Sequence, residues 1–287
     1  MNRNYLLRLL ITLFISSLML LAGCSTMGSN TKGSIHSGID SVNFTVPADQ
    51  QIVIIYNHGI QYPQQREPCF MWYNKPPPSL KAQINANTLV YSLCSTSVES
   101  PVPTSAGKQV YLRKQEINFA IDAFLARGIQ PKHIFLAGHS NGGWTSLMMM
   151  RDVNKRFNGV IAYAPAFAGK RSDVSFAPWW RNTARPKQIN DMLRAPQMDA
   201  LVFAYENDVY NRPQDLVFLK ENYPYNGDHG VWFISYDCKN KSAHQTFRND
   251  CHLKRTQQQI RTFINKQIET WTYKFFRVIS KVINIYY

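Results

Sequence analysis

The segment from residue 134 to residue 150 constrains this chain most, because a glycine-rich turn joins a short apolar run directly to a helical pattern. The run Ile134–Ala137 predicts a buried strand, and Trp144–Met150 predicts a helix. Between them stands Gly138-His139-Ser140-Asn141-Gly142-Gly143. A Gly-x-Ser-x-Gly motif requires this context of strand, sharp turn and helix. We therefore expect Ser140 at the apex of a strained turn, with glycines that let strand and helix pass closely.

Similar apolar runs recur along the chain and alternate with longer helical patterns, as parallel strands covered by helices on both faces would. With 45% hydrophobic and 17% charged residues, the 287-residue chain is too apolar for a disordered protein and suits one large domain. We predict the α/β class, with a mostly parallel sheet. The predicted strands are Ile52–Tyr56, Thr88–Leu93, Ile134–Ala137, Gly159–Tyr163, Ala200–Tyr205 and Val231–Tyr236, and the predicted helices are Lys108–Arg127, Asn141–Arg151, Pro213–Glu221 and His252–Ile268.

Right-handed crossovers would place every loop that follows a strand at one end of the sheet, where open α/β sheets bind ligands. Two stretches interrupt the alternation. Pro68–Ser79 is expected to be a rigid excursion from the sheet. Ala166–Pro196 (residues 166–196) is expected to be a short lid-like insertion over the ligand end. Within the insertion, Trp179, Trp180 and Arg181 are candidates for binding an anionic substrate group or lipid headgroups. A solvated lid face is the alternative.

The N-terminus has the pattern of an export signal. Arg3 and Arg8 precede the apolar run Leu9–Leu21, which is short for a membrane span, so residues 1–23 are predicted to be a signal peptide. The run Leu21-Ala22-Gly23-Cys24 resembles the lipobox of bacterial lipoproteins, which implies acylation of Cys24 and an exported protein anchored by lipid in the cell envelope. An uncleaved anchor helix is the alternative. Residues 24–41 are then expected to be a flexible tether, and residues 42–268 the folded domain.

The chain is strongly basic, with a formal net charge of +14. Such a charge favours nucleic acid or an anionic membrane surface as a partner. A protein tethered beside anionic lipid needs no nucleic acid to account for it, so the membrane is the expected partner. Residues 269–287 continue the pattern as a basic amphipathic helix, suited to a membrane surface or a partner groove. Packing on the core is the alternative.

Four cysteines follow Cys24, an even number that favours two disulfides in an exported chain. Three connectivities are possible, and we favour pairing of sequence neighbours. Buried free thiols are the alternative. The preferred pairs are Cys69 with Cys94 and Cys238 with Cys251.

From about Val42 to Lys266 the chain resembles the α/β-hydrolase superfamily. The resemblance rests on the Gly138–Gly142 turn, on Asn57-His58-Gly59 at the end of an early strand, and on the order of the acid and histidine candidates downstream. It implies a serine nucleophile and an oxyanion hole made by two backbone amides, those of Asn141 and Ile60, with Gln61 as a substitute for Ile60. Members of the family often have a second glycine after His-Gly, where this chain has Ile60.

A serine nucleophile needs a base and an orienting acid. Of the seven histidines, only His244 and His252 follow the last predicted strand. His244 lies in a polar loop and is the preferred base, whereas His252 opens a helix. Asp208, which follows the strand ending at Tyr205, stands where the family carries its acid. Glu206 is the second candidate, and Asp215 is expected to be solvated.

Ser140, Asp208 and His244 occur in the order that α/β-hydrolases use. Such a triad transfers acyl groups to water from esters, thioesters or amides. We expect a lipid-anchored serine hydrolase, a carboxylesterase of the dienelactone hydrolase-like or lipase-like kind acting on a small-molecule ester or acyl substrate. A peptidase on the same fold and a non-catalytic binding lipoprotein are the alternatives. No cofactor or metal is expected, because no cluster of His and carboxylate residues has the spacing of metal ligands.

Overall fold

The computed structural model describes residues 37–59, 74–95, 106–152, 156–167, 180–238, 244–245 and 252–283, and of residues 37, 106–108, 180–181 and 272–283 the backbone alone. All of them belong to one compact unit, Ile35–Tyr287. The predicted signal peptide, Cys24 and most of the predicted tether lie outside these residues.

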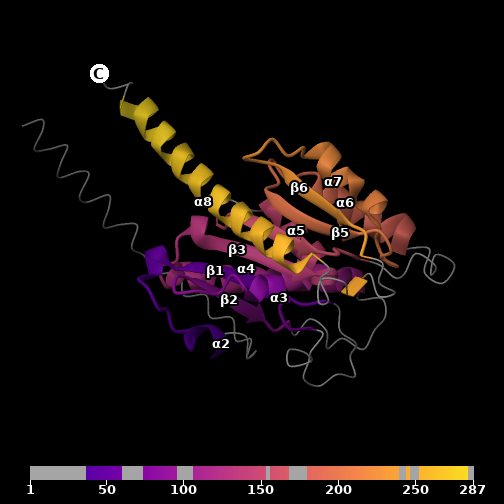
Figure 1. The fold of residues 1–287 in the computed structure, drawn as a ribbon, viewed down its shortest axis with the longest axis horizontal. Coiled ribbons are helices and arrows are strands. Elements are labelled where there is room, and N and C mark those ends of the chain that lie inside the picture. Colours follow the sequence, from indigo (N-terminus) through magenta and orange to yellow (C-terminus); the bar gives the residue numbers. More distant parts are fainter. Residues whose placement is uncertain are drawn as a thin grey trace, which may run out of the picture. The chain divides into compact units, whose positions relative to one another are not determined.

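The centre of the fold is a parallel sheet of six strands in the order β2-β1-β3-β4-β5-β6 (Figure 1). All six predicted strands are confirmed, although β1 and β3 run one and two residues further than expected. Every pair of neighbouring strands is parallel, so the loops that follow the strands share one edge of the sheet. The strands are β1 Ile52–Asn57, β2 Thr88–Leu93, β3 Ile134–His139, β4 Gly159–Tyr163, β5 Ala200–Tyr205 and β6 Val231–Tyr236.

Helices cover both faces of the sheet, which accounts for the continuous apolar runs of the strands. In β1, Val53 and Ile55 face the core shared with α4–α7, whereas Ile54 and Tyr56 face α3 and α8 on the other side (Figure 1). The predicted α/β class is therefore confirmed. The helices are α2 Ser37–Asp40, α3 Pro78–Lys81, α4 Ala106–Ala126, α5 Asn141–Met149, α6 Arg185–Met192, α7 Val217–Asn222 and α8 Leu253–Ile283. Shorter helical turns span Ala48–Gln50, Pro131–His133, Met150–Asp152, Trp180–Ala184 and Pro213–Leu216.

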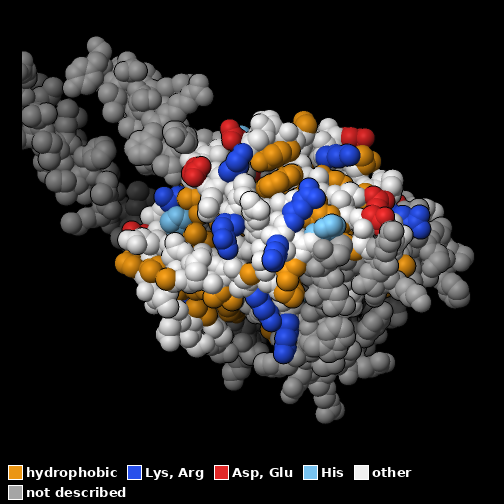
Figure 2. Space-filling view, in the orientation of Figure 1, with side chains coloured by type: hydrophobic (Ala, Val, Ile, Leu, Met, Phe, Trp, Pro, Cys, Tyr) orange, Lys and Arg blue, Asp and Glu red, His pale blue; other side chains and the backbone are white. Residues whose placement is uncertain are grey.

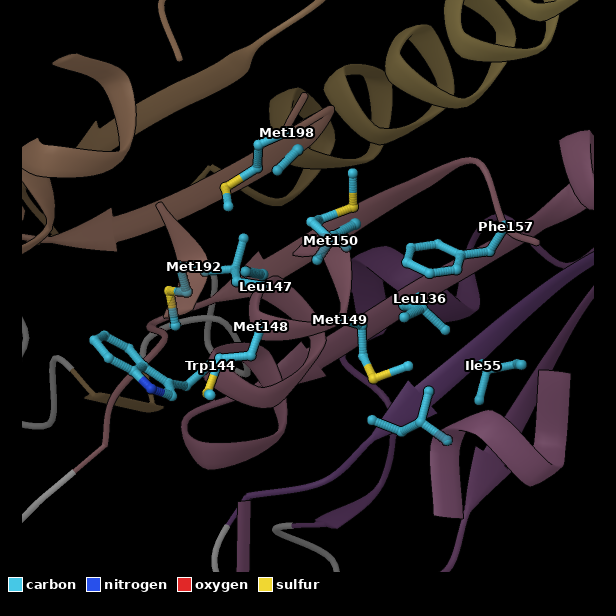
Figure 3. Close-up of a cluster of buried hydrophobic side chains, with 14 of the residues drawn as sticks. Ile55, Leu136, Trp144, Leu147, Met148, Met149, Met150, Phe157, Met192 and Met198 are labelled. Atoms are coloured by element: carbon cyan, nitrogen blue, oxygen red, sulfur yellow. The ribbon is translucent and has the colours of Figure 1, made fainter. Parts of the chain in front are cut away.

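Methionines fill the core around α5. Five of the nine methionines of the chain are buried in the larger core cluster. Figure 3 shows Met148 and Met192 beside Trp144, and Met149 directed toward the strand residues Ile55 and Leu136. Their flexible thioethers suit the irregular space beside a helix that approaches the sheet closely. These methionines are Met148, Met149, Met150, Met192 and Met198.

The folded domain begins earlier than Val42. Ile39, which the sequence analysis placed in the tether, is 1% exposed and packs in the larger core cluster. The guanidinium of Arg127, at the end of α4, donates hydrogen bonds to the carbonyl oxygens of Ile39 and Val42. The polar composition around Ile39 concealed this single anchoring side chain.

Two further boundaries differ from those expected. The second half of the predicted 166–196 lid contains α6, where Met192 and Gln188 are buried and Gln188 accepts a hydrogen bond from the indole of Trp144 at 2.8 Å. This helix belongs to the layer that covers the sheet, while residues 168–179 lie outside the described residues. At the C-terminus, residues 269–283 of the predicted helix are the continuation of α8 rather than a separate element.

The side chain of Ile268 on α8 packs against the smaller core cluster. Packing on the core therefore extends to the start of the predicted amphipathic segment. Among the described residues, no helix combines the length and apolarity that crossing a membrane requires.

Replacing Ile39 tests where the folded domain begins. We expect Ile39→Ala to lower the free energy of unfolding by about 2–4 kcal/mol, because it removes buried methyl and methylene groups. Ile84→Ala is the matched control: Ile84 is 55% exposed, and its loss should change stability by less than about 0.5 kcal/mol. Urea unfolding followed by circular dichroism measures both. Equal effects in the two variants would contradict the anchoring role of Ile39.

Candidate active site

Ser140 occupies the sharp turn between β3 and α5. Its backbone has φ 54° and ψ −123°, a left-handed conformation that side chains other than glycine rarely adopt. Its N–H donates to the carbonyl of Tyr163, and its own carbonyl accepts the N–H groups of Trp144 and Ala166. Among the described non-glycine residues, only Ser140 and its neighbour Ala164 have positive φ. Backbone strain of this kind is typical of functional sites.

The glycines of the motif are required by the backbone that surrounds them. A Cβ on Gly138 would overlap the backbone of Gly142, and a Cβ on Gly142 would overlap the carbonyl of Asn57 at the end of β1. Gly143 has a similarly close neighbour in the carbonyl of Gly138. The first turn of α5 therefore touches the ends of β1 and β3 directly, as the motif predicts.

The structure brings the three predicted catalytic residues together. The Oγ of Ser140 lies 2.8 Å from the Nε2 of His244, and the Nδ1 of His244 lies 2.8 Å from the Oδ2 of Asp208. A carboxylate can only accept, so Nδ1–H donates to Asp208 and Nε2 accepts the serine hydroxyl. Ser140 follows β3, Asp208 follows β5 and His244 comes after β6, so the parallel sheet delivers all three to one edge.

Asp208 is completely buried, and its second oxygen, Oδ1, accepts the N–H groups of Tyr210 and Asn211 at 2.7 and 3.4 Å. The amide of Asn211 in turn donates to the carbonyl of Pro165, in the loop after β4. The acid therefore has a fixed orientation toward His244.

The other candidates have different surroundings. Glu206 accepts a hydrogen bond from Ser235 on β6, and Asp215 caps the helical turn that begins at Pro213. His252 packs its ring against Tyr236. None of these contacts is with the triad.

Two aromatic residues contact the imidazole of His244. The ring of Tyr210 lies 4.3 Å from it, and that of His139 lies 4.8 Å from it, measured between ring centroids. The Nε2–H of His139 also donates to the backbone carbonyl of His244 at 2.9 Å. His139 thus helps to hold His244 beside Ser140. From the sequence, His139 was expected only to form part of the turn.

Of the two predicted oxyanion donors, one lies within the described residues. Asn141 is the first residue of α5, where backbone N–H groups have no partner within the helix and the helix dipole favours negative charge. Ile60, like its substitute Gln61, lies outside the described residues. Gly59, just before it, lies beside the nucleophile: a Cβ on Gly59 would be 3.5 Å from the Cβ of Ser140.

A buried polar network behind this loop was not predicted. Arg113 of α4 donates to the carbonyl of His58 at 2.6 Å and to the Oδ1 of Asn141 at 3.2 Å. The Nε2 of His58 accepts the N–H of Ser95 at 3.2 Å, and its Nδ1–H donates to the carbonyl of Gly59 at 2.7 Å. Burial, and secondarily the charge of Arg113, lowers the pKa of His58 to about 3. His58 is therefore neutral.

The sequence contained a signal for this network. Arg113 interrupts the apolar stripe of α4, standing three residues after Val110 and four before Ile117, both fully buried. A charged residue in such a stripe indicates a buried polar contact.

The chain is similar in sequence and structure to known hydrolases. The sequence model of the Prolyl oligopeptidase family matches residues 115–207. A propionate-bound esterase from the Planctomycetes species Thermogutta terrifontis superposes with a TM-score of 0.54 at 13% identity, over 77% of this chain and 85% of that one. Together with the parallel sheet and the turn at Ser140, this decides the fold.

This chain has the α/β-hydrolase fold.

Two further structures are similar to this chain. The first belongs to LipS and LipT, lipolytic enzymes derived from a metagenome, with a TM-score of 0.53 and 14% identity, over 76% of this chain and 95% of that one. The second is a prolyl endopeptidase, with a TM-score of 0.53 and 14% identity, over 78% of this chain but only 35% of that one. No curated protein sequence matches the chain.

Of the remaining predicted site residues, some lie outside the described part of the chain. Trp179 lies outside the described residues, and Trp180 and Arg181 are described by backbone alone, in the turn Trp180–Ala184. Cys94 follows β2 and Cys238 follows β6, while Cys69 and Cys251 lie outside the described residues, so the disulfide pairing stays a prediction. In the described part of the chain, no group of three His, Cys, Asp or Glu side chains could hold a metal ion.

The neutral His58 predicts a pH dependence of stability. Unfolded His58 takes up a proton near pH 6.5, whereas folded His58 stays neutral down to about pH 3, so stability falls as the pH falls between these values. Arg113 faces the ring, and the buried Glu116 carboxylate lies behind Ser95. From about pH 7 to pH 5, His58 should account for a loss of about 2 kcal/mol.

Urea unfolding of wild type and His58→Gln at both pH values measures this contribution. We expect a smaller loss of stability in His58→Gln, and the wild-type loss in the control His252→Gln. An equal loss in wild type and His58→Gln would contradict a neutral, buried His58.

Proposed function

We propose that this protein is a serine hydrolase that cleaves carboxylic esters through Ser140, His244 and Asp208. One observation carries the proposal: two hydrogen bonds of 2.8 Å connect the serine hydroxyl to the imidazole and the imidazole to the buried carboxylate. This is the arrangement that activates a serine nucleophile.

In the proposed reaction, the Oγ of Ser140 attacks the ester carbonyl carbon while Nε2 of His244 takes the hydroxyl proton. Asp208 stabilises the imidazolium that forms. The negative oxygen of the tetrahedral intermediate is stabilised by the N–H of Asn141 at the start of α5. The bond to the leaving alcohol then breaks, His244 returns the proton to that alcohol, and an acyl group remains on Ser140. Water, activated by His244, hydrolyses this acyl-enzyme and restores the serine.

Esters are the favoured substrates because the structural neighbours include esterases and lipolytic enzymes. Structures of the Thermogutta terrifontis esterase include propionate-bound and butyrate-bound forms, and one that is phosphonylated by sarin. These are short acyl groups and a reagent that reacts with an activated nucleophile. We infer that this protein acts on small-molecule esters or other small acyl substrates.

Peptide hydrolysis is the second candidate function, supported by the match of residues 115–207 to the Prolyl oligopeptidase family and by the similarity to a prolyl endopeptidase. The described domain matches only 35% of that endopeptidase chain.

We also propose that the protein is exported and held at a bacterial membrane by lipid on Cys24. The lipobox-like run Leu21–Cys24 supports this, and so does the charge of one face. Lys254, Arg255 and Arg261 are exposed on α8. Figure 2 views the side of the domain that α8 covers, with basic side chains spread over it and acidic ones toward the margins of the view. A basic face favours contact with anionic lipid headgroups.

Lipid attachment can be tested in a bacterial host. We expect radioactive palmitate to label the wild type and the neighbouring control Ser25→Ala, and Cys24→Ala to carry no label and to leave the membrane fraction. Labelling of Cys24→Ala would contradict the proposed anchor.

The triad is tested by hydrolysis of p-nitrophenyl acetate. We expect Ser140→Ala to lose at least about 10⁴-fold in kcat, because the nucleophile is removed. His252→Ala, the control for the base, should keep most of the activity, since the ring of His252 packs on Tyr236 and the hydroxyl of Ser140 is hydrogen-bonded to His244. Full activity of Ser140→Ala, or loss in His252→Ala with retention in His244→Ala, would contradict the assignment.

The same proteins separate the three functional alternatives. A fluorophosphonate probe should label Ser140 in the wild type and not in Ser140→Ala, whereas a binding lipoprotein without catalysis would not be labelled. Turnover of p-nitrophenyl acetate without turnover of proline-containing peptide anilides is expected of the esterase. Faster cleavage of the anilides would favour the peptidase.

A further inference from the structure

Arg113 is a buried charge that the proposed reaction does not use directly. It lies in the middle of α4, is 2% exposed, and extends from the core side of the helix toward the ends of the strands. Burying a guanidinium is costly unless hydrogen bonds compensate for the lost water. The hydrogen-bond partners of Arg113 therefore indicate its role.

The guanidinium contacts three separate segments around the nucleophile. Nη1 donates to the carbonyl of His58 at 2.6 Å, and both Nη1 and Nη2 make longer contacts, of 3.4 and 3.5 Å, to the carbonyl of Gly59. Nη1 also reaches the Oδ1 of Asn141 at 3.2 Å, and Nε reaches the hydroxyl of Ser95 at 3.3 Å. One side chain thus joins the ends of β1 and β2 to the first residue of α5.

A carboxylate on the same helix balances the charge. Glu116 is 7% exposed and accepts a hydrogen bond from the Ser95 hydroxyl that Arg113 contacts. Burial lowers the pKa of Arg113 to about 10, while the charge of Glu116 acts in the opposite direction. Arg113 therefore keeps its charge at neutral pH.

These contacts orient the peptide groups closest to Ser140. The carbonyl of His58 points toward Arg113, and in a planar trans peptide the N–H of the next residue, Gly59, points the opposite way. Gly59 lies against Ser140, and the side chain of Asn141 is fixed by Arg113 and by the hydroxyl of Thr145. Both segments expected to supply oxyanion donors are thus attached to the same guanidinium.

We propose that Arg113 is a positioning residue that holds the oxyanion-binding backbone in place by joining the loop after β1 to the start of α5. This proposal rests on the proposed esterase function and adds a residue that acts through others. The planar guanidinium can donate to several acceptors in fixed directions, which a lysine ammonium on a flexible chain cannot reproduce. The stabilisation of the intermediate, rather than the affinity for substrate, should therefore depend on Arg113.

The test compares Arg113→Ala and Arg113→Lys with wild type in the hydrolysis of p-nitrophenyl acetate. We expect kcat to fall by about 100-fold in Arg113→Ala, the loss typical of removing one oxyanion donor, with KM changed by less than about threefold. In Arg113→Lys, kcat should fall by about 10-fold, because lysine keeps the positive charge but lacks the planar set of guanidinium donors. Methylguanidinium in the buffer should restore part of the activity of Arg113→Ala. The acid limb of the pH–rate profile should not move, since the base is untouched.

Lys114→Ala is the matched control, because Lys114 is the next basic residue of α4 and pairs with Asp152 away from the site. It should retain the wild-type kcat. If Arg113→Ala fails to fold, as judged by circular dichroism, Arg113→Lys decides the question. A folded Arg113→Lys with wild-type kcat, or a rise in KM alone, would overturn the proposal.

The proposal and the function beneath it fail in different ways. A wild-type protein that neither hydrolyses the ester nor reacts with the fluorophosphonate probe would refute the proposed function. An active wild type accompanied by equally active, folded Arg113 variants would refute only the role of Arg113.

Discussion

The close approach of α5 to the ends of β1 and β3 is the constraint on which the rest of the site depends. Gly138 and Gly142 allow backbone to touch backbone there, and the chain reverses direction at Ser140 in a left-handed conformation. The same contact places the start of a helix beside the nucleophile and brings Asn141 within reach of Arg113. The strained turn, the position of Ser140 and the expected oxyanion site at the start of α5 therefore all depend on this close backbone contact.

The sheet, and the residues that meet at its edge, could be predicted because the strand patterns are local. The four inner strands are apolar runs buried on both faces. All six strands were found from such runs, although β1 and β3 end one and two residues later than predicted. The parallel topology then brings the loops after the strands to one edge. Asp208 and His244 were selected by their order after β5 and β6, and the structure places His244 at Ser140 and Asp208 at His244.

The parts that could not be predicted depend on single long-range contacts. Ile39 stands in a polar segment. Nothing in that segment indicates that its side chain packs in the core or that Arg127 donates to its carbonyl. Arg113 is visible as an interruption of an apolar stripe, but its acceptors lie on three segments far apart in the sequence. The limits of α8 were missed because helical periodicity continues unbroken across the expected boundary at residue 269.

The hydrogen bond from His139 to the backbone of His244 makes two neighbours in the sequence interdependent. His139 donates to the backbone carbonyl of His244, while Nε2 of the His244 imidazole accepts the hydroxyl of Ser140. Both bonds end on His244, so displacing this residue would break its contact with His139 as well as its contact with Ser140. The position before the serine, which the Gly-x-Ser-x-Gly motif leaves open, therefore helps to hold His244 in this molecule.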